Sequence, residues 1–533
     1  MAARSRARRA SARLDAASLE VFRHLFAAVA EEMGLSLQRS ALSANIRERR
    51  DFSCALFDAS GALVAQAAHI PVHLGSRGRA VECVRAAARL GRGDAVLHND
   101  PYTGGTHLPD VTLVSPVFLP GERSARFYAA SRAHHSDIGG AHPGSMAPVD
   151  DVHAEGLRLP PVHLVRAGEL VPELLALLRA NLRDAREREG DLLAQWAANR
   201  RAAARLADLA AEHGAEELSL RARALVEWTA ARVGELVSRF PARRVTFRDS
   251  LEPARVGGAP VELVLHLRRV RGELELDFRD CADQQGASLN ATRAVTEAAV
   301  AYSLALLLPQ GTPINEGSRA HVRILTRPGS VVDASYPAPV AAGNVETSQR
   351  LVDVLLGAFA AVFPERIPAA SAGTMSNLSF GGVHAGASFA YYETIAGGSG
   401  ASAEGPGAHA VHTHMTNTRN TPIEEFERRY PVRLERCTVR RGSGGAGRAR
   451  GGDGIEKRLR FLVAARAAWI GDRSSVGPYG LAGGAAGATG SLAHLRDGIQ
   501  RPLGPRATLE LAPGDELSVK TPGGGGHGRA PRR

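Results

Sequence analysis

The sequence predicts a mixed α+β protein made of several domains, and three observations support this. The chain has 533 residues, more than one hydrophobic core usually organises, which favours two or three domains. Stretches with an apolar residue at every third or fourth position, typical of helices, occur beside stretches in which apolar and polar residues alternate, typical of strands. The last part of the chain is dense in glycine yet keeps apolar strand patterns, which indicates a turn-rich β region.

The first part of the chain comprises a tail and an α/β region. Residues 1–14 are rich in arginine and contain no acidic residue, so we expect a basic, disordered tail. Residues 15–165 open with an amphipathic helix, in which Leu19 and Phe26 share one face. A hairpin follows, because two alternating runs flank the turn-forming residues 58–61. Further strand patterns then lead into the motifs that carry most of the chemistry.

Three more regions complete the predicted organisation. Residues 166–240 repeat apolar residues four positions apart and carry arginine and glutamate between them, which predicts a helical subdomain. Residues 241–430 combine alternating strand patterns with an apolar, buried helix, and they form a second α/β region that holds the substrate-site motifs. Residues 431–533 form the glycine-rich β region and a tail.

The net charge of +11 does not indicate a nucleic-acid-binding protein. Five arginines in residues 1–13 and three in residues 529–533 contribute eight of these positive charges. A nucleic-acid interface should instead form a basic patch on a folded face. We therefore expect no nucleic-acid partner.

The distribution of cysteine and of apolar residues predicts a cytoplasmic protein. The four cysteines lack CxxC spacing, which fits a reducing compartment and no disulfide framework. No run approaches 18 apolar residues, so no membrane span is expected. No apolar segment typical of a secretory signal is visible near the start of the sequence.

Lysine is almost absent, which bears on ATP binding. Only Lys457 and Lys520 occur, against 64 arginines. Arginine replaces lysine as a surface charge, but it does not replace the lysine of a phosphate-binding loop. Neither lysine follows a GxxxxG pattern, so we expect that ATP is not bound by a Walker-type site in this chain.

Two short segments combine histidines, carboxylates and paired glycines. The first, "HNDPYTGGTHLPD", spans residues 98–110, and the second, "SRAHHSDIGG", spans residues 131–140. Neutral imidazole nitrogens and carboxylate oxygens are the ligands of zinc, manganese and iron in proteins. Two such loops can converge on one divalent cation, with glycine allowing the backbone to approach closely. The alternative is that these side chains only make structural hydrogen bonds in loops.

A third polar segment, residues 391–431, is flanked by glycines and predicts a lining for a polar substrate. Its alternative is a turn network of asparagine and threonine that joins two β segments. The candidate substrate-binding residues are Glu393, His412, His414, Asn417 and Arg419. Two other motifs leave alternatives open. "GNVETSQR" (residues 343–350) either caps a helix or places an anion at its start, and "TPGGGGHG" near the end favours a flexible or tightly turned tail over a phosphate loop.

Nine motifs, in order between residues 17 and 528, resemble those of the hydantoinase B/oxoprolinase family. That family includes B subunits of N-methylhydantoinases, the second half of 5-oxoprolinases and the α-type subunit of acetone carboxylases. The motifs are "HIPVHLGS", "HNDPYTGGTHLPD", "RAHHSDIGG", "EGLRLPPV", "GNVETSQR", "YYETIAGGSGA", "HTHMTNTRNTPIE", "GSGGAGRARGGDG" and "TPGGGGHG".

The resemblance implies a division of labour between two subunits. An A-type partner with an actin-like ATPase fold would phosphorylate the substrate, and this B-type chain would complete the reaction at its own metal site. The expected assembly is a hetero-oligomer such as (AB)2, and the expected substrate is a hydantoin or 5-oxoproline type of cyclic amide. The alternatives are the α-type subunit of an ATP-dependent acetone or aryl-ketone carboxylase, a metallohydrolase that needs no partner, and a non-catalytic scaffold.

The resemblance also assigns residues within the two histidine-rich segments. It implies a divalent manganese, zinc or iron ion held by Asp100, His107, Asp110 and His134. His135 and Asp137 are the expected catalytic residues, or they orient the ligands of the metal.

Overall fold

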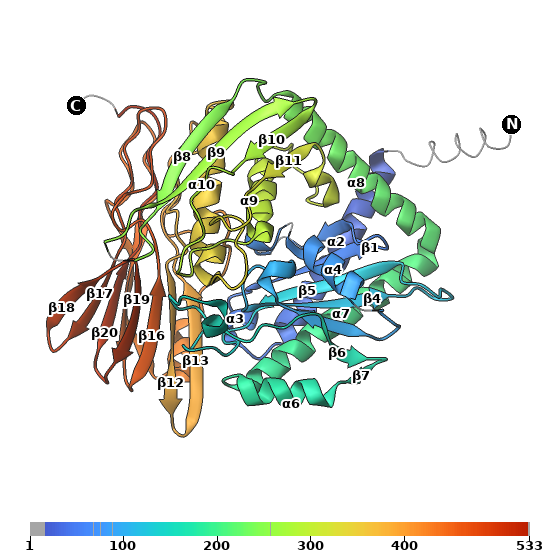
Figure 1. Cartoon of the computed structure of the whole chain (residues 1–533), viewed down its shortest axis with the longest axis horizontal. Coiled ribbons are helices and arrows are strands. Elements are labelled where there is room, and N and C mark those ends of the chain that lie inside the picture. Colours follow the sequence, from blue (N-terminus) through green and yellow to red (C-terminus); the bar gives the residue numbers. More distant parts are fainter. Residues whose placement is uncertain (1–15, 68, 75, 88, 256, 531–533) are drawn as a thin grey trace.

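The computed structural model describes residues 16–67, 69–74, 76–87, 89–255 and 257–530 (Figure 1). It confirms the mixed α+β class, since helices and four β-sheets occur in the described part of the chain. The basic tail expected for residues 1–14 lies outside the described residues. Within those ranges, none of the helices is both long and apolar enough to cross a membrane.

The first sheet is antiparallel and has the order β2-β1-β5-β4-β3-β6-β7. Residues of the central strands are buried on both faces, because helices cover both sides. Its strands are β1 (Phe52–Asp58), β2 (Leu63–Gln66), β3 (Ala95–His98), β4 (Asp110–Val117), β5 (Phe127–His134), β6 (Val162–Arg166) and β7 (Glu169–Leu170).

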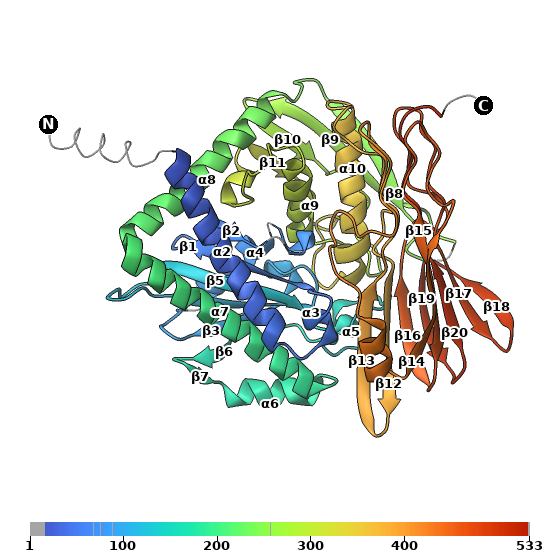
Figure 2. The same ribbon diagram turned by 180° about the vertical axis from the view of Figure 1, so that it is seen from behind.

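Long helices cover one face of this sheet, as seen from behind in Figure 2. They are α2 (Ala16–Ser40), α7 (Ala185–His213) and α8 (Ala215–Ser238), and their apolar residues share a core with β1 and β5. On the opposite face, α4 (Ser76–Ala87) packs against the alternate residues of the same strands. The segment predicted to be helical also contains α6 (Pro172–Asn181).

A second sheet, with the order β11-β10-β9-β8, holds the largest described core. Two helices, α9 (Arg293–Ala305) and α10 (Ser348–Ala360), pack against it. A π-helix, η4 (Gly343–Thr347), leads directly into α10. The strands are β8 (Val245–Leu251), β9 (Val261–Val270), β10 (Glu273–Asp277) and β11 (Val322–Leu325).

The C-terminal part contains two further sheets that share one apolar core. Their orders are β13-β12-β16-β19 and β14-β15-β20-β17-β18. The short helix α11 (Ile423–Arg429) packs at the edge of this core through Phe426. The strands are β12 (Asn377–His384), β13 (Ala387–Thr394), β14 (Val432–Arg440), β15 (Gly454–Phe461), β16 (Ala465–Ile470), β17 (Ser491–Arg496), β18 (Ile499–Leu503), β19 (Arg506–Leu511) and β20 (Glu516–Lys520).

Glycine is dense in this region because several extended segments pack backbone against backbone. Gly524 donates to the carbonyl of Gly452 and accepts from the amide of Gly445, both at 2.9 Å. A Cβ added at Gly524 would lie 1.9 Å from the carbonyl oxygen of Ser399, which leaves no room for a side chain. Residues 521–528 ("TPGGGGHG") pack with the segments around Gly445 and Gly452 into a glycine bundle, and they form its buried centre. The expectation of a flexible or tightly turned tail was wrong.

A candidate metal centre at the ends of two strands

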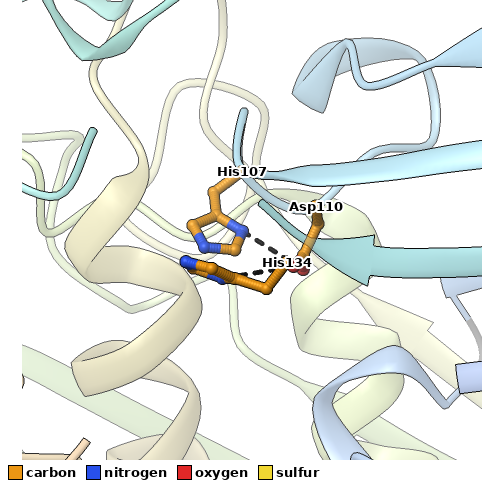
Figure 3. A group of neighbouring side chains, drawn as sticks. All are labelled: His107, Asp110 and His134. Carbon is orange, nitrogen blue, oxygen red and sulfur yellow. Dashed lines mark ion pairs between the residues drawn. The ribbon is translucent and has the colours of Figure 1, made fainter. Parts of the chain in front are cut away.

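Two paired strands and the turn before one of them bring His107, Asp110 and His134 together (Figure 3). Asp110 is the first residue of β4 and His134 the last residue of β5, and the antiparallel register places them opposite each other. His107 stands three residues earlier, and the amide of His135 donates to Pro109 in the same turn at 2.9 Å. One ligand atom from each of the three side chains lies within 4.8 Å of the others.

The three side chains are buried and point toward one another. His107 Nδ1 lies 3.2 Å from Asp110 Oδ2, and His134 Nδ1 lies 3.5 Å from Asp110 Oδ1. The exposed fractions are 0%, 1% and 3% for His107, Asp110 and His134. A cluster of polar groups this deeply buried needs compensation by hydrogen bonds or by a bound ion.

The environment favours the protonation states that bind a cation. Burial by itself would raise the pKa of Asp110, but His107 and His73 hold that pKa well below its usual value. Burial lowers the pKa of His134, against the opposing effect of its contact with the Asp110 carboxylate. An ionised carboxylate and a neutral imidazole are the forms that ligate a metal ion.

Unpartnered atoms in this group fit a bound divalent cation. His107 Nδ1, Asp110 Oδ1 and His134 Nε2 are buried and make no hydrogen bond of good geometry, and the contacts of His107 Nδ1 and Asp110 Oδ1 lie within the group itself. Leaving such atoms unpaired typically costs about 1–3 kcal/mol each. Two imidazoles and a carboxylate form a donor set that zinc, manganese and iron accept. The residues present therefore suit the metal that the family resemblance implies.

Neighbouring hydrogen bonds fix the orientation of Asp110. Its Oδ2 accepts from Thr106 Oγ1 at 2.6 Å and from His73 Nε2 at 3.1 Å. Because His73 donates through Nε2, its Nδ1 accepts from Ser53 Oγ at 2.8 Å. Partners of this kind hold a ligand in one orientation and are expected to tune its affinity for the metal.

Tyr392 packs on the imidazole of His134, and two hydrogen bonds fix the backbone of the same residue. The ring of Tyr392 stacks on its imidazole at 4.4 Å between centroids, with an angle of 12° between the planes. Asn45 Nδ2 donates to the carbonyl of His134 at 2.6 Å, and the amide of His134 donates to the carbonyl of Asp51 at 3.0 Å. This packing restricts the rotation of the imidazole about its side-chain bonds.

Comparison with known proteins identifies the family. The model of the family described as hydantoinase B/oxoprolinase matches residues 15–530. The chain belongs to the hydantoinase B/oxoprolinase family.

Relatives within and around the hydantoinase B/oxoprolinase family differ in length and activity. The chain is 37% identical to 5-oxoprolinase 1 of Arabidopsis thaliana over 96% of its length, but it spans only 42% of that relative. The crystal structure of ATP-dependent caprolactamase from Pseudomonas jessenii superimposes with a TM-score of 0.89 at 26% identity, covering 97% of this chain and 92% of that one. The nucleotide-free structure of acetone carboxylase shares the fold alone, with a TM-score of 0.86 at 18% identity over 97% and 76% of the two chains.

Three expected site residues of this hydantoinase B/oxoprolinase chain contact groups outside the metal centre: Asp100, His135 and Asp137. The carboxylate of Asp100 accepts from the amide of Tyr102 at 3.1 Å and lies 3.8 Å from Arg158, outside the three-residue group. His135 Nε2 donates to Gln195 Oε1 at 3.0 Å on the opposite side of β5 from His134. Asp137 accepts from the amides of two glycines and from Arg183, so it holds a loop in place.

The expected substrate-binding residues do not all lie together. Glu393 is paired with Lys457, whose Nζ lies 2.6 Å from each carboxylate oxygen. Asn417 and Arg419 are exposed. His412 lies 3.4 Å from Thr418 Oγ1, and burial lowers its pKa to about 3. His414 is buried beside Tyr302, and burial lowers its pKa to about 4.

Three residues near the metal centre were missed by the sequence reasoning. His73 belongs to "HIPVHLGS", and no short spacing connects it with Asp110, 37 residues away. Asp51 is brought beside His134 by the pairing of β1 with β5, and its backbone carbonyl accepts from the amide of His134. Burial raises the pKa of Asp51, while His134 and Arg49 lower it. Asn344 Nδ2 lies 3.4 Å from His107 Nε2.

Proposed function

We propose that this chain is the metal-dependent B-type subunit of an ATP-dependent enzyme that opens the ring of a cyclic amide. The observation that carries the proposal is the buried group of His107, Asp110 and His134, whose ligand atoms converge in a member of this family. The names of the relatives support the substrate class. A 5-oxoprolinase and a caprolactamase both act on ring amides, and the two resemblances cover 96% and 97% of this chain.

The composition supports a separate ATP-binding partner. The chain spans 42% of the plant 5-oxoprolinase, so that longer relative has room for a second functional part. The sequence contains two lysines, and neither stands in a phosphate-loop pattern. We propose an A-type, actin-like ATPase subunit that phosphorylates the amide oxygen and turns it into a leaving group, in a hetero-oligomer with this chain.

The residues of the site would have different roles in binding the cation. His107, Asp110 and His134 would hold the cation, and Thr106 and His73 would orient Asp110. A divalent cation bound there supplies Lewis-acid chemistry, which polarises a carbonyl and acidifies water. Tyr392 covers one face of His134 and keeps bulk water from it. Burial of the group strengthens its electrostatic interactions with a substrate.

Carboxylation of a ketone is the second candidate. Acetone carboxylase shares the fold, so the architecture alone accommodates either reaction. Ring opening is favoured because the caprolactamase chain is the more similar of the two structures, at 26% against 18% identity.

The test is an assay of the chain co-expressed with an A-type subunit. Purified complex is given ATP and, in separate reactions, 5-oxoproline, hydantoin, ε-caprolactam, or acetone with bicarbonate. ATP-dependent hydrolysis of at least one ring amide is expected. Turnover of a ketone with bicarbonate, and of no amide, would favour the carboxylase, and ring opening by the chain alone without ATP would favour a self-sufficient hydrolase.

A matched pair of variants tests whether this chain is catalytic. His107→Ala removes an expected ligand, and we expect at least a roughly hundredfold loss of rate in the assembled complex. His24→Ala, at a histidine side chain that is 66% exposed, is the control and should keep the full rate. A complex of His107→Ala with unchanged activity would show that the chain is a scaffold.

A further inference from the structure

The chain enters α10 through a π-helical turn, η4. The amide of Ser348 donates to the carbonyl of Gly343, a step of five residues in place of the usual four. Single π-helical turns next to α-helices are frequent at functional sites. Asn344 in this turn and Gln349 in the first turn of α10 both carry side-chain amides.

Both side-chain amides are buried, and only one of the two polar atoms in each has a contact. The Asn344 amide lies against His107 Nε2 at 3.4 Å, and Gln349 Nε2 donates to the carbonyl of Thr413 at 2.9 Å. The other ends, Asn344 Oδ1 and Gln349 Oε1, are buried and have no partner. Each side chain is thus fixed at one end by the protein and leaves its other polar atom for a ligand.

A third unpartnered atom comes from the neighbouring loop. His414 Nε2 is buried without a partner, while Nδ1 lies 3.4 Å from Tyr302 Oη. The backbone of His414 has a φ of +56°, which is unfavourable for a residue with a side chain. Conformations of this kind persist where the surroundings demand them and cluster at ligand sites.

Contacts between neighbouring segments link these residues to the metal centre. Thr413, which Gln349 contacts, is two residues from Met415, whose carbonyl accepts from the amide of Val72 at 3.2 Å. The next residue after Val72 is His73, which contacts Asp110. Asp110 in turn contacts His107, and His107 contacts Asn344.

We propose that Asn344, Gln349 and His414 form a subsite that holds the amide group of a neutral ring beside the metal centre. The inference rests on the proposed function and deepens it. A ring amide presents an N–H donor and a carbonyl acceptor side by side, and an asparagine or glutamine amide presents the complementary pair. The subsite contains no carboxylate, lysine or arginine, so it recognises a neutral amide and leaves any charged group of the substrate to other contacts.

The same residues suit the substrate after activation. Phosphorylation at the amide oxygen leaves the ring nitrogen either as an acceptor or protonated as a donor. A side-chain amide meets both cases, since a half-turn of its plane exchanges the carbonyl and the NH₂ group. A neutral imidazole likewise offers one donor and one acceptor nitrogen.

The experiment measures binding of two small probes to the full-length, metal-loaded chain by NMR titration. 2-Pyrrolidone has the ring N–H, and N-methyl-2-pyrrolidone lacks it. We expect the wild-type chain to bind 2-pyrrolidone roughly tenfold more tightly, the effect of losing about one hydrogen bond. In Gln349→Leu this preference should disappear while the metal content stays unchanged. Gln349→Met, which keeps an unbranched side chain, carries the same test if the leucine variant does not fold.

A buried amide elsewhere provides the control. Asn199, on α7, donates to the carbonyl of Leu113 and also has an unpartnered Oδ1. Asn199→Leu should lower thermal stability and keep the probe preference. Wild-type chain that binds neither probe, or a Gln349 variant that keeps the wild-type preference, overturns the subsite. Ring opening by the wild-type complex is measured separately. Failure of the subsite in the binding experiment is therefore distinguishable from failure of the proposed function.

Discussion

Asp110 opens β4 directly opposite His134, the residue that ends β5. This pairing places a carboxylate and an imidazole at one edge of the sheet, where the turn before β4 adds His107. The centre therefore depends on strand register, because a slip of one residue would turn either side chain to the other face of the sheet. Residues of a rigid sheet hold ligands more accurately than residues of a loop.

His73 is expected to tune the affinity for the metal without being required for it. Replacing it in His73→Phe removes the hydrogen bond to Asp110, and the loss of such a partner typically lowers affinity about 10–100-fold. Asp110→Asn removes a charged donor and should lower the affinity further. Competition with a chromogenic chelator measures both variants. Equal affinity in wild type and His73→Phe would show that His73 has no part in the centre.

Glu346 is expected to make stability fall as pH rises. Burial raises its pKa to about 8, above the value of 4.5 for an unperturbed carboxyl group. In the unfolded chain the group ionises near pH 4.5, whereas in the folded chain it stays protonated until about pH 8. Stability is therefore fully present below pH 4.5 and is lost as pH rises toward 8, by on the order of a few kcal/mol.

The matched variant for this test is Glu346→Gln. It keeps an acceptor for the amide of Met375 and for Asn377 Nδ2 and cannot ionise. Chemical denaturation at pH 6 and pH 8.5 should show a smaller loss of unfolding free energy in the variant than in wild type. The same loss in both proteins would mean that Glu346 is ionised throughout in the folded chain.

The glycine bundle is expected to tolerate no side chain at its centre. Gly524→Ala would place a Cβ 1.9 Å from the Ser399 carbonyl oxygen, and the overpacking should cost about 3 kcal/mol or more. Gly405→Ala is the control, since nothing lies within 4 Å of the added atom there. Thermal melting compares the two. Matching melting temperatures for both variants would contradict the packing of the bundle.

Local patterns predicted elements better than they predicted contacts between elements. The pattern in residues 52–58 and the spacing in the 166–240 segment predicted β1 and the helices α6 to α8. In the helices, burial of one face leaves a regular repeat of apolar residues. His107 and Asp110 were noticed since they are close in sequence. Asp51 and His73 reach the centre through strand pairing and a short turn. Contacts between segments that are far apart in the sequence leave no local pattern from which they could be predicted.

The role of the final glycines was missed for a related reason. Gly524 contacts residues near 399 and 452, and glycine density by itself does not distinguish a flexible tail from a packed backbone. The π-turn before α10 also leaves no helical spacing to detect, although "GNVETSQR" marked its position.

The most direct test of the metal centre is the metal content of the full-length chain by elemental analysis. Purified protein is dialysed against metal-free buffer and measured beside His107→Ala and His24→Ala. We predict about one zinc, manganese or iron ion per chain, retained in His24→Ala and lost in a folded His107→Ala. A folded wild-type chain that holds none of these ions after supply of each, or a His107→Ala variant that retains the full amount, would contradict the account.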